Sequence, residues 1–156
     1  MATTSDTSVR REVVVNAPVE RAFAVFTERF DTWWPRDFQI AERPAQVFVM
    51  EPRAGGRWYE RAADGTECEW GEVLAWEPPS RLLLAWRISA SWQYDPGLLT
   101  EVDVRFTDAG DGRTRVVLEH RGLEQYGAEA GRMTGTFGSD GGWSRVLAGY
   151  AAVVSR

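Results

Sequence analysis

The chain has 156 residues, which is enough for one domain with its own apolar core. Its formal net charge of −5 argues against nucleic acid or an anionic membrane as the main partner, because phosphate binding depends on clustered positive charge. It has no lysine, one cysteine (Cys68) and one histidine (His120), so we expect no Schiff base, no internal disulfide, no metal and no cofactor.

The first part of the chain predicts a strand followed by helices. Residues 9–15 are rich in β-branched side chains, which is typical of a strand. Pro18 at a first helical position, followed by apolar residues at helical spacing, predicts a helix through about residue 29. Pro35 closes this region, so a short second helix or a turn precedes it.

The middle of the chain predicts a meander of short antiparallel strands. Dipeptides such as Asp64-Gly65 and Asp111-Gly112 favour tight turns between strands, and Pro96-Gly97 marks another turn. The runs that indicate strands are residues 47–50, 57–60, 67–76, 81–88, 100–107 and 114–120.

The last part predicts a long amphipathic helix. Ser139 or Asp140 can cap it, and its apolar residues follow helical spacing. That apolar face holds Trp143, Val146, Leu147, Tyr150, Val153 and Val154. Residues 122–138 are rich in glycine and indicate a loop with a short helical piece.

This order of elements predicts an α+β fold. A curved antiparallel sheet of about six or seven strands needs a cover for its apolar face, and the C-terminal helix is the long amphipathic element that can provide it. Such a sheet wrapped around one helix often leaves a cavity between the two. We expect a flexible N-terminus over residues 1–8 and a single domain over residues 9–156, without signal peptide or membrane span and located in the cytoplasm. The oligomeric state is not predicted.

Several stretches resemble a known superfamily. Residues 18–23 (PVERAF), after the first strand, resemble the opening of the START-like, helix-grip superfamily, also called Bet v 1-like or SRPBCC. Residues 55–59, 71–82 and 112–120 are similar to its Hsp90-activator-homologue branch, and Gly142-Trp143 at the start of the last helix completes the set. The resemblance spans about residues 9–155 and implies the helix-grip fold.

The resemblance implies a cavity rather than one chemistry. The superfamily includes lipid carriers, polyketide cyclases, plant hormone receptors, Hsp90 co-chaperone domains and self-sacrificing resistance proteins against enediynes. We therefore expect a small, largely apolar or aromatic molecule as partner. The alternatives are natural-product resistance or sequestration, or a cyclase or hydrolase-like enzyme that uses the same cavity. A co-chaperone role is less expected, because Hsp90 activators also carry a separate N-terminal domain.

Aromatic residues make up 12% of the chain, including eight tryptophans. They can pack a core or line a pocket for a flat ligand, and the sequence leaves both interpretations open. Trp58 and Trp70 cannot both be assigned to the inner face, because one bulge reverses the alternation. The candidate ligand-binding residues are Trp34, Phe38, Trp58, Trp70, Trp86, Trp92, Phe106, His120, Trp143 and Tyr150.

His120 is the only candidate for a catalytic residue. Alternation places it on the same face as Val116 and Leu118, so its ring is expected to point inward. An inward imidazole can act as a general acid or base, or it can orient a polar group of a ligand. The structural alternative is a histidine that is simply hydrogen-bonded near a strand end.

The other polar candidates have simpler interpretations. Arg57 and Arg87 could each anchor a ligand carboxylate or phenolate, although most arginines in proteins are solvated. Glu67 and Glu69 are expected on the solvated outer face of the sheet. Cys68 is expected to be a buried small residue rather than a nucleophile.

Overall fold

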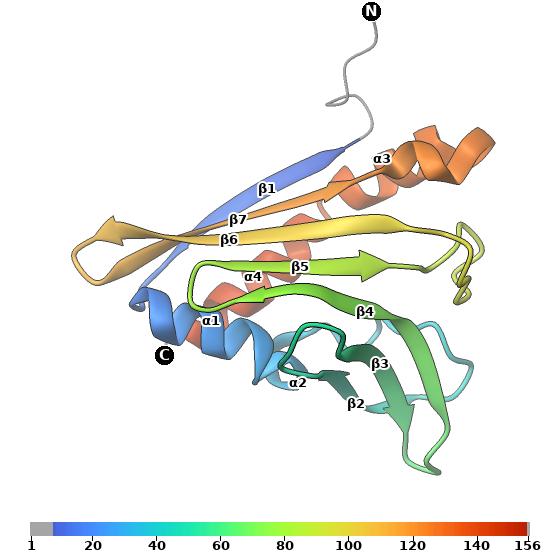
Figure 1. Ribbon diagram of the computed structural model, residues 1–156, viewed down its shortest axis with the longest axis horizontal. Helices are drawn as coiled ribbons and strands as arrows, with labels where there is room; N and C mark the ends of the chain where they lie inside the picture. Colours follow the sequence, from blue (N-terminus) through green and yellow to red (C-terminus); the bar gives the residue numbers. More distant parts are fainter. Residues whose placement is uncertain (1–7, 156) are drawn as a thin grey trace, which may run out of the picture.

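A curled antiparallel sheet of seven strands forms the body of the computed structural model, which describes residues 8–155 (Figure 1). The strand order is β1-β7-β6-β5-β4-β3-β2, so the first and second strands of the chain lie at opposite edges. Tight turns join β3 to β4 and β6 to β7, as predicted, with Gly65 and Gly112 at positive φ. The strands are β1 (Val9–Val15), β2 (Ala45–Met50), β3 (Arg57–Ala62), β4 (Glu67–Glu77), β5 (Arg81–Trp86), β6 (Thr100–Gly110) and β7 (Arg113–Arg121).

Two helices follow β1, as predicted. Pro18 is the N-cap of α1 (Val19–Thr27) rather than its first residue, and the helix ends two residues earlier than expected. The short second helix is α2 (Phe30–Trp33), which stops before Pro35. The expectation of a flexible N-terminus over residues 1–8 lies outside the described residues except for position 8.

The C-terminal segment is more helical than predicted. Residues 122–138 were expected to form a loop with a short helical piece; the helical part is present but longer than expected, because the segment forms η2 (Leu123–Glu129) and α3 (Ala130–Gly138), with a kink at Gly127. The final helix, α4 (Trp143–Val154), begins after Gly142 and has no side-chain cap, so neither Ser139 nor Asp140 caps it. Ser139 instead donates its hydroxyl to the Thr136 carbonyl oxygen.

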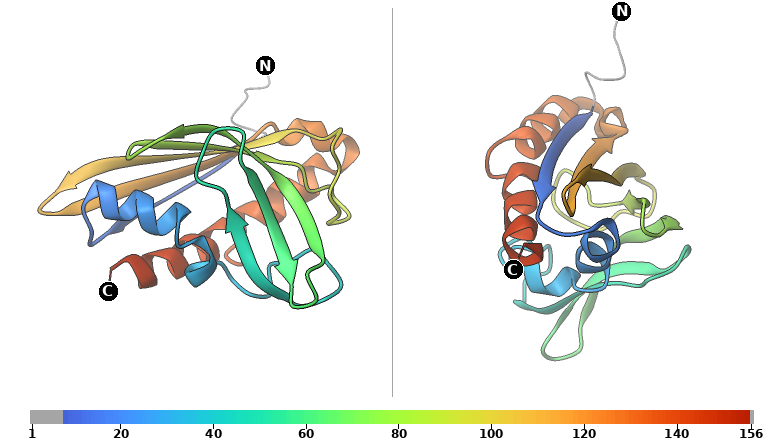
Figure 2. Two further views of the ribbon diagram at one scale, coloured as in Figure 1. Left: turned by 60° about the horizontal axis from the view of Figure 1, so that its bottom comes forward. Right: turned by 90° about the vertical axis from the view of Figure 1, so that its left-hand side faces the viewer.

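The helices cover one face of the sheet. α4 packs against β1, α1 and α2, and Figure 2 shows β2 and β3 running at a steep angle to β6 and β7. The Tyr150 hydroxyl donates to the Ala22 carbonyl oxygen at 2.7 Å and so ties α4 to α1. This is the helix-grip fold, as expected from the sequence.

The sheet bends where β4 changes partner. The first half of β4 pairs with β3 and its second half pairs with β5. Gly71 lies at this change, where an added Cβ would come within 1.9 Å of the Ala85 carbonyl oxygen. A register shift in the same place pairs Trp58 with Gly71 but Tyr59 with Glu69, so Trp70 is an extra residue on β4. Both Trp58 and Trp70 are therefore buried.

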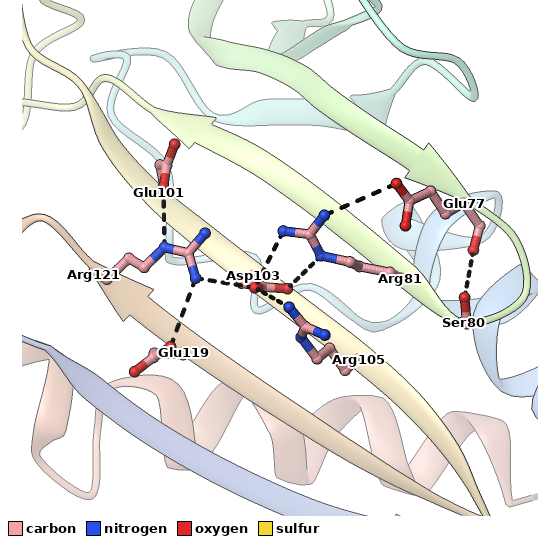
Figure 3. Close-up of polar contacts among 8 residues, drawn as sticks. All are labelled: Glu77, Ser80, Arg81, Glu101, Asp103, Arg105, Glu119 and Arg121. Atoms are coloured by element: carbon pink, nitrogen blue, oxygen red, sulfur yellow. Dashed lines mark hydrogen bonds and ion pairs between the residues drawn. The ribbon is translucent and has the colours of Figure 1, made fainter.

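The outer face of the sheet carries charged side chains in ion pairs. Figure 3 shows Asp103 on β6 in contact with Arg81, Arg105 and Arg121. Glu101 and Glu119 contact Arg121 in turn, at 3.0 and 3.8 Å.

Candidate functional site

A cavity of about 330 Å³ lies between the sheet, the segment after α2, and helices α3 and α4. Its inner wall is made of buried side chains, among them Trp70, Trp86 and Trp143. Its mouth is formed by residues that are exposed or half-buried, among them Phe38 and Trp92. Elements far apart in the sequence therefore build one largely aromatic site.

Six of the ten candidate residues line this cavity: Trp34, Phe38, Trp70, Trp86, Trp92 and Trp143. The other four do not. Phe106 and Tyr150 pack in the core around Phe26, and Trp58 and His120 lie fully buried next to the cavity-lining Trp86. That any of the ten touches a ligand stays a prediction.

Nine further residues line the cavity that were not among the ligand-binding candidates from the sequence. Val146 had a usable signal, because it shares the apolar face of α4 with Trp143. Phe137 was missed because its segment was taken for a loop. The nine are Asp37, Gln39, Ile40, Ile88, Thr136, Phe137, Gly141, Gly142 and Val146.

Four of the five tryptophans that line the cavity use their N–H groups in bonds to the protein. Trp34 Nε1 donates to the Phe38 carbonyl oxygen at 2.9 Å. Trp86 Nε1 donates to the Tyr126 hydroxyl at 3.1 Å, and burial raises the pKa of Tyr126 to about 12. Trp70 and Trp143 are likewise bonded. These four indoles thus offer a ligand mainly carbon surface and ring faces.

His120 lies outside the cavity wall and connects two residues of that wall, Trp143 on α4 and Trp86 on β5, through hydrogen bonds. The Trp143 N–H can only donate, so His120 Nδ1 accepts it (3.1 Å) and the ring proton sits on Nε2. Nε2 then donates to Thr100 Oγ1 at 2.8 Å, and the Thr100 hydroxyl donates to the Trp86 carbonyl oxygen at 2.9 Å. Burial lowers the pKa of His120 to about 3, so the ring is neutral at pH 7.

A buried carboxylate holds the segment after α2 against the sheet. Glu60, on β3, is 2% exposed. Its Oε1 accepts the backbone N–H of Ile40 at 2.7 Å and the Trp70 indole N–H at 2.9 Å, and its Oε2 accepts the Ala41 N–H at 3.4 Å. Glu60 therefore fixes one cavity-lining residue on the sheet and another on the mouth.

An ion pair lies at the mouth. Asp37 accepts two hydrogen bonds from the Arg145 guanidinium, at 3.0 and 2.7 Å, and this contact lowers the pKa of Asp37. The same guanidinium lies 4.6 Å from the ring centroid of Phe38. The pair thus links α4 to the segment after α2.

The remaining polar candidates are not part of the cavity wall. Arg57 pairs with Glu67 and Glu69 on the opposite side of the sheet, where the two glutamates were expected. Arg87 pairs with Glu72 at 2.7 Å. Cys68 is half-buried, and burial is the main cause of its raised pKa.

Residues 8–155 contain no group of three or more His, Cys, Asp and Glu side chains placed to hold a metal ion. None of the helices in this part of the chain has the length and apolar character needed to cross a membrane.

Comparisons with known proteins identify the family and agree with the fold. Residues 16–155 match the family model described as "Activator of Hsp90 ATPase homolog 1-like protein". The solved structure of the anthrahydroquino-gamma-pyrone synthase Txn09 complexed with SUM is 40% identical, covers 94% of this chain and 96% of that chain, and has a TM-score of 0.65. The self-sacrificing resistance protein CalC from Micromonospora echinospora is 31% identical, with coverage of 94% and 93% and a TM-score of 0.70.

Protein MLL2253 from Mesorhizobium loti shares the fold at 20% identity, with coverage of 94% of this chain and 96% of that chain and a TM-score of 0.67. A search of curated proteins gives no match.

Proposed function

The chain belongs to the family of Activator of Hsp90 ATPase homolog 1-like proteins, and on that premise we propose that it binds a flat, largely aromatic small molecule in the cavity between the sheet and helices α3 and α4. The observation that carries the proposal is the aromatic wall of this cavity. Its volume of about 330 Å³ falls in the range of small-molecule sites, roughly 300–1,000 Å³. Similarity to Txn09 and CalC supports a natural-product ligand.

The wall explains the preference for flat rings. The indoles of Trp70, Trp86 and Trp143 approach the cavity from the sheet and from α4, and their N–H groups are already bonded. A flat aromatic ligand gains both apolar burial and ring contacts there, while a flexible chain gains burial alone and loses more conformational entropy.

The test is an amide NMR titration with a panel of fatty acids, flavonoids and aromatic polyketides. We expect saturable shifts from the aromatic compounds, centred on residues that line the cavity. The variant Val146→Phe fills part of the cavity and should abolish the shifts while the protein stays folded. The control Val153→Phe lies on the same helix outside the cavity and should bind normally. Absence of saturable shifts from every aromatic compound, or equal binding by both variants, overturns the proposal.

A second candidate function is chemical action on the bound molecule, and the 40% identity to a synthase favours it. The compound identified by titration is incubated with a small amount of protein, and both are then examined by mass spectrometry. A new product formed over many turnovers identifies an enzyme. Cleavage of the protein identifies self-sacrifice of the kind named for CalC. Recovery of both unchanged identifies a carrier or sequestering protein.

A further inference from the structure

The polar groups of the cavity are distributed unevenly. The indole N–H groups of the inner wall are bonded, Gln39 uses both ends of its amide, and Asp37 is paired with Arg145. Within residues 8–155, the cavity-lining side chains whose polar atoms have no hydrogen bond are Trp92 and Thr136. Both are exposed, so the free hydrogen-bonding capacity of the side chains lies at the mouth.

Trp92 and Thr136 belong to neighbouring parts of the mouth. The Trp92 ring packs edge-on against Phe137, with centroids 6.1 Å apart, and Thr136 precedes Phe137 on α3. Arg132 Nη2, also on α3, donates to the Ala90 carbonyl oxygen at 3.0 Å and ties the helix to the segment that carries Trp92. The two free groups are therefore held on one side of the opening.

The backbone of Trp92 is strained in a way that favours a role at this position. Its φ is +61°, in the left-handed region that bulky residues rarely adopt. The turn is fixed by the bond from Trp92 N to the Ser89 carbonyl oxygen at 2.9 Å and by a bridge between Ile88 and Tyr94. Glycine would fit this backbone without strain, yet a tryptophan with an unpaired N–H occupies it and lines the cavity.

We infer that the ligand is a polycyclic aromatic molecule with carbonyl or phenolic oxygens along one edge, and that this edge lies at the mouth against the Trp92 N–H and the Thr136 hydroxyl. This inference rests on the proposed function and adds the substituents and the orientation of the ligand. The indole N–H donates to a ligand oxygen, and the hydroxyl donates or accepts. In the reverse orientation the oxygens would face an inner wall whose N–H groups are already bonded, and each would lose its hydrogen bonds to water without replacement.

The test compares two molecules with the same three-ring skeleton, anthracene and 1,8-dihydroxyanthraquinone, by tryptophan fluorescence titration in buffer with a little organic cosolvent. The variants are Trp92→Phe, which keeps a ring but loses the N–H, and Thr136→Val, which keeps the shape but loses the hydroxyl. Each should weaken binding of the dihydroxyanthraquinone about five- to tenfold, the value of one hydrogen bond, and change anthracene binding less than twofold.

The outcomes separate the two proposals. Equal weakening of both molecules, or weakening of neither, overturns the orientation while leaving the cavity as a binding site. If the unmodified protein binds neither molecule, the proposed function fails and the inference fails with it. Thr136 is exposed on α3 and its replacement leaves the core untouched, so this variant gives a result even if Trp92→Phe unfolds the segment around it.

Discussion

Each buried indole brings an N–H group that needs an acceptor, so a core this rich in tryptophan must also supply polar atoms. Trp70 uses the Glu60 carboxylate and Trp143 uses the His120 ring. Trp58 Nε1 is buried and has no hydrogen-bond partner within residues 8–155. Trp58 and Trp70 are equally buried, so the hydrogen bond of the indole N–H is a difference between them that stability measurements can detect.

The first prediction compares Trp70→Phe with Trp58→Phe. Both residues are 1% exposed, and both changes remove the same part of the ring. Trp70→Phe also removes a donor from the buried Glu60 carboxylate, whereas Trp58→Phe removes an N–H that has no partner. We expect Trp70→Phe to cost about 1–3 kcal/mol more in free energy of unfolding, measured in urea. Equal losses would contradict this account of the core.

The second prediction concerns the only histidine of the chain. The pKa of His120 is about 3 in the folded protein, against about 6.5 for an unperturbed histidine, because the buried ring is held in its neutral form. Between these values the unfolded chain binds one more proton than the folded protein. The free energy of unfolding should therefore fall by about 1.4 kcal/mol for each pH unit below about 6.5, until pH approaches 3.

Urea titrations between pH 7 and pH 4.5 measure this slope. The variant His120→Gln has no group that titrates there and serves as the reference, since the carboxylates are common to both proteins. A matching slope in the two proteins would contradict this account, because it would show that the imidazole takes up its proton at the same pH in the folded and unfolded states. A long-range ¹⁵N spectrum of the ring should also report a proton on Nε2 at pH 7.

At the scale of elements, the bend of the sheet depends on the close approach of β4 and β5 at Gly71. An added Cβ would lie 1.9 Å from the backbone oxygen of Ala85, which cannot move without disturbing the pairing of β5 with β6. We predict that Gly71→Ala destabilises the fold by more than about 3 kcal/mol. The control Gly135→Ala, inside α3 where an added Cβ meets no atom within 4 Å, should stabilise by about 0.5–1 kcal/mol. Thermal unfolding of both variants checks this, and a tolerated Gly71→Ala would contradict it.

The elements themselves were largely predictable from the sequence. The strands and the first helix follow from alternation, helical spacing and turn dipeptides, which act over a few residues. The extent of helix over residues 122–138 was underestimated because the glycines of this segment lower helix propensity. Met133 and Phe137, four residues apart, are both buried on one face of α3, and this packing overrides the local preference.

The sequence predicted where the cavity lies, between the sheet and the C-terminal helix, but it did not predict every residue that lines it. Alternation identifies which side chains point inward, yet it does not distinguish a wall residue such as Trp86 from a core residue such as Phe106. The register shift beside Trp58 decides the orientation of Trp70, and no local pattern marks it. The position of Trp92 at the mouth depends on a tertiary contact as well as on its own turn, because its ring packs against Phe137 of α3.

At the scale of the whole molecule, the two faces of the sheet carry different kinds of side chain. The inner face and the helices hold most of the aromatic side chains, and the outer face holds arginines and carboxylates in ion pairs (Figure 3). Because the inner face contains a cavity, apolar packing there is incomplete. The outer network centres on Asp103, whose side chain is 4% exposed, so we expect it to contribute more to stability than isolated surface ion pairs do.

Asp103 is the centre of that network and provides the last prediction. Its side chain is 4% exposed, and it contacts Arg81 and Arg105 at 3.3 Å and Arg121 at 3.1 Å (Figure 3). Asp103→Asn keeps the shape but removes the charge that three guanidinium groups share, so we expect the free energy of unfolding to fall by about 1–3 kcal/mol. The matched change Glu119→Gln alters a half-exposed group 3.8 Å from Arg121 and should cost less than about 0.5 kcal/mol. Urea unfolding in low and high salt separates the two, because salt screens exposed pairs far more than a buried centre. If both variants lose the same small amount, the outer network adds nothing beyond ordinary surface pairs, and the apolar inner face alone supports the fold around its cavity.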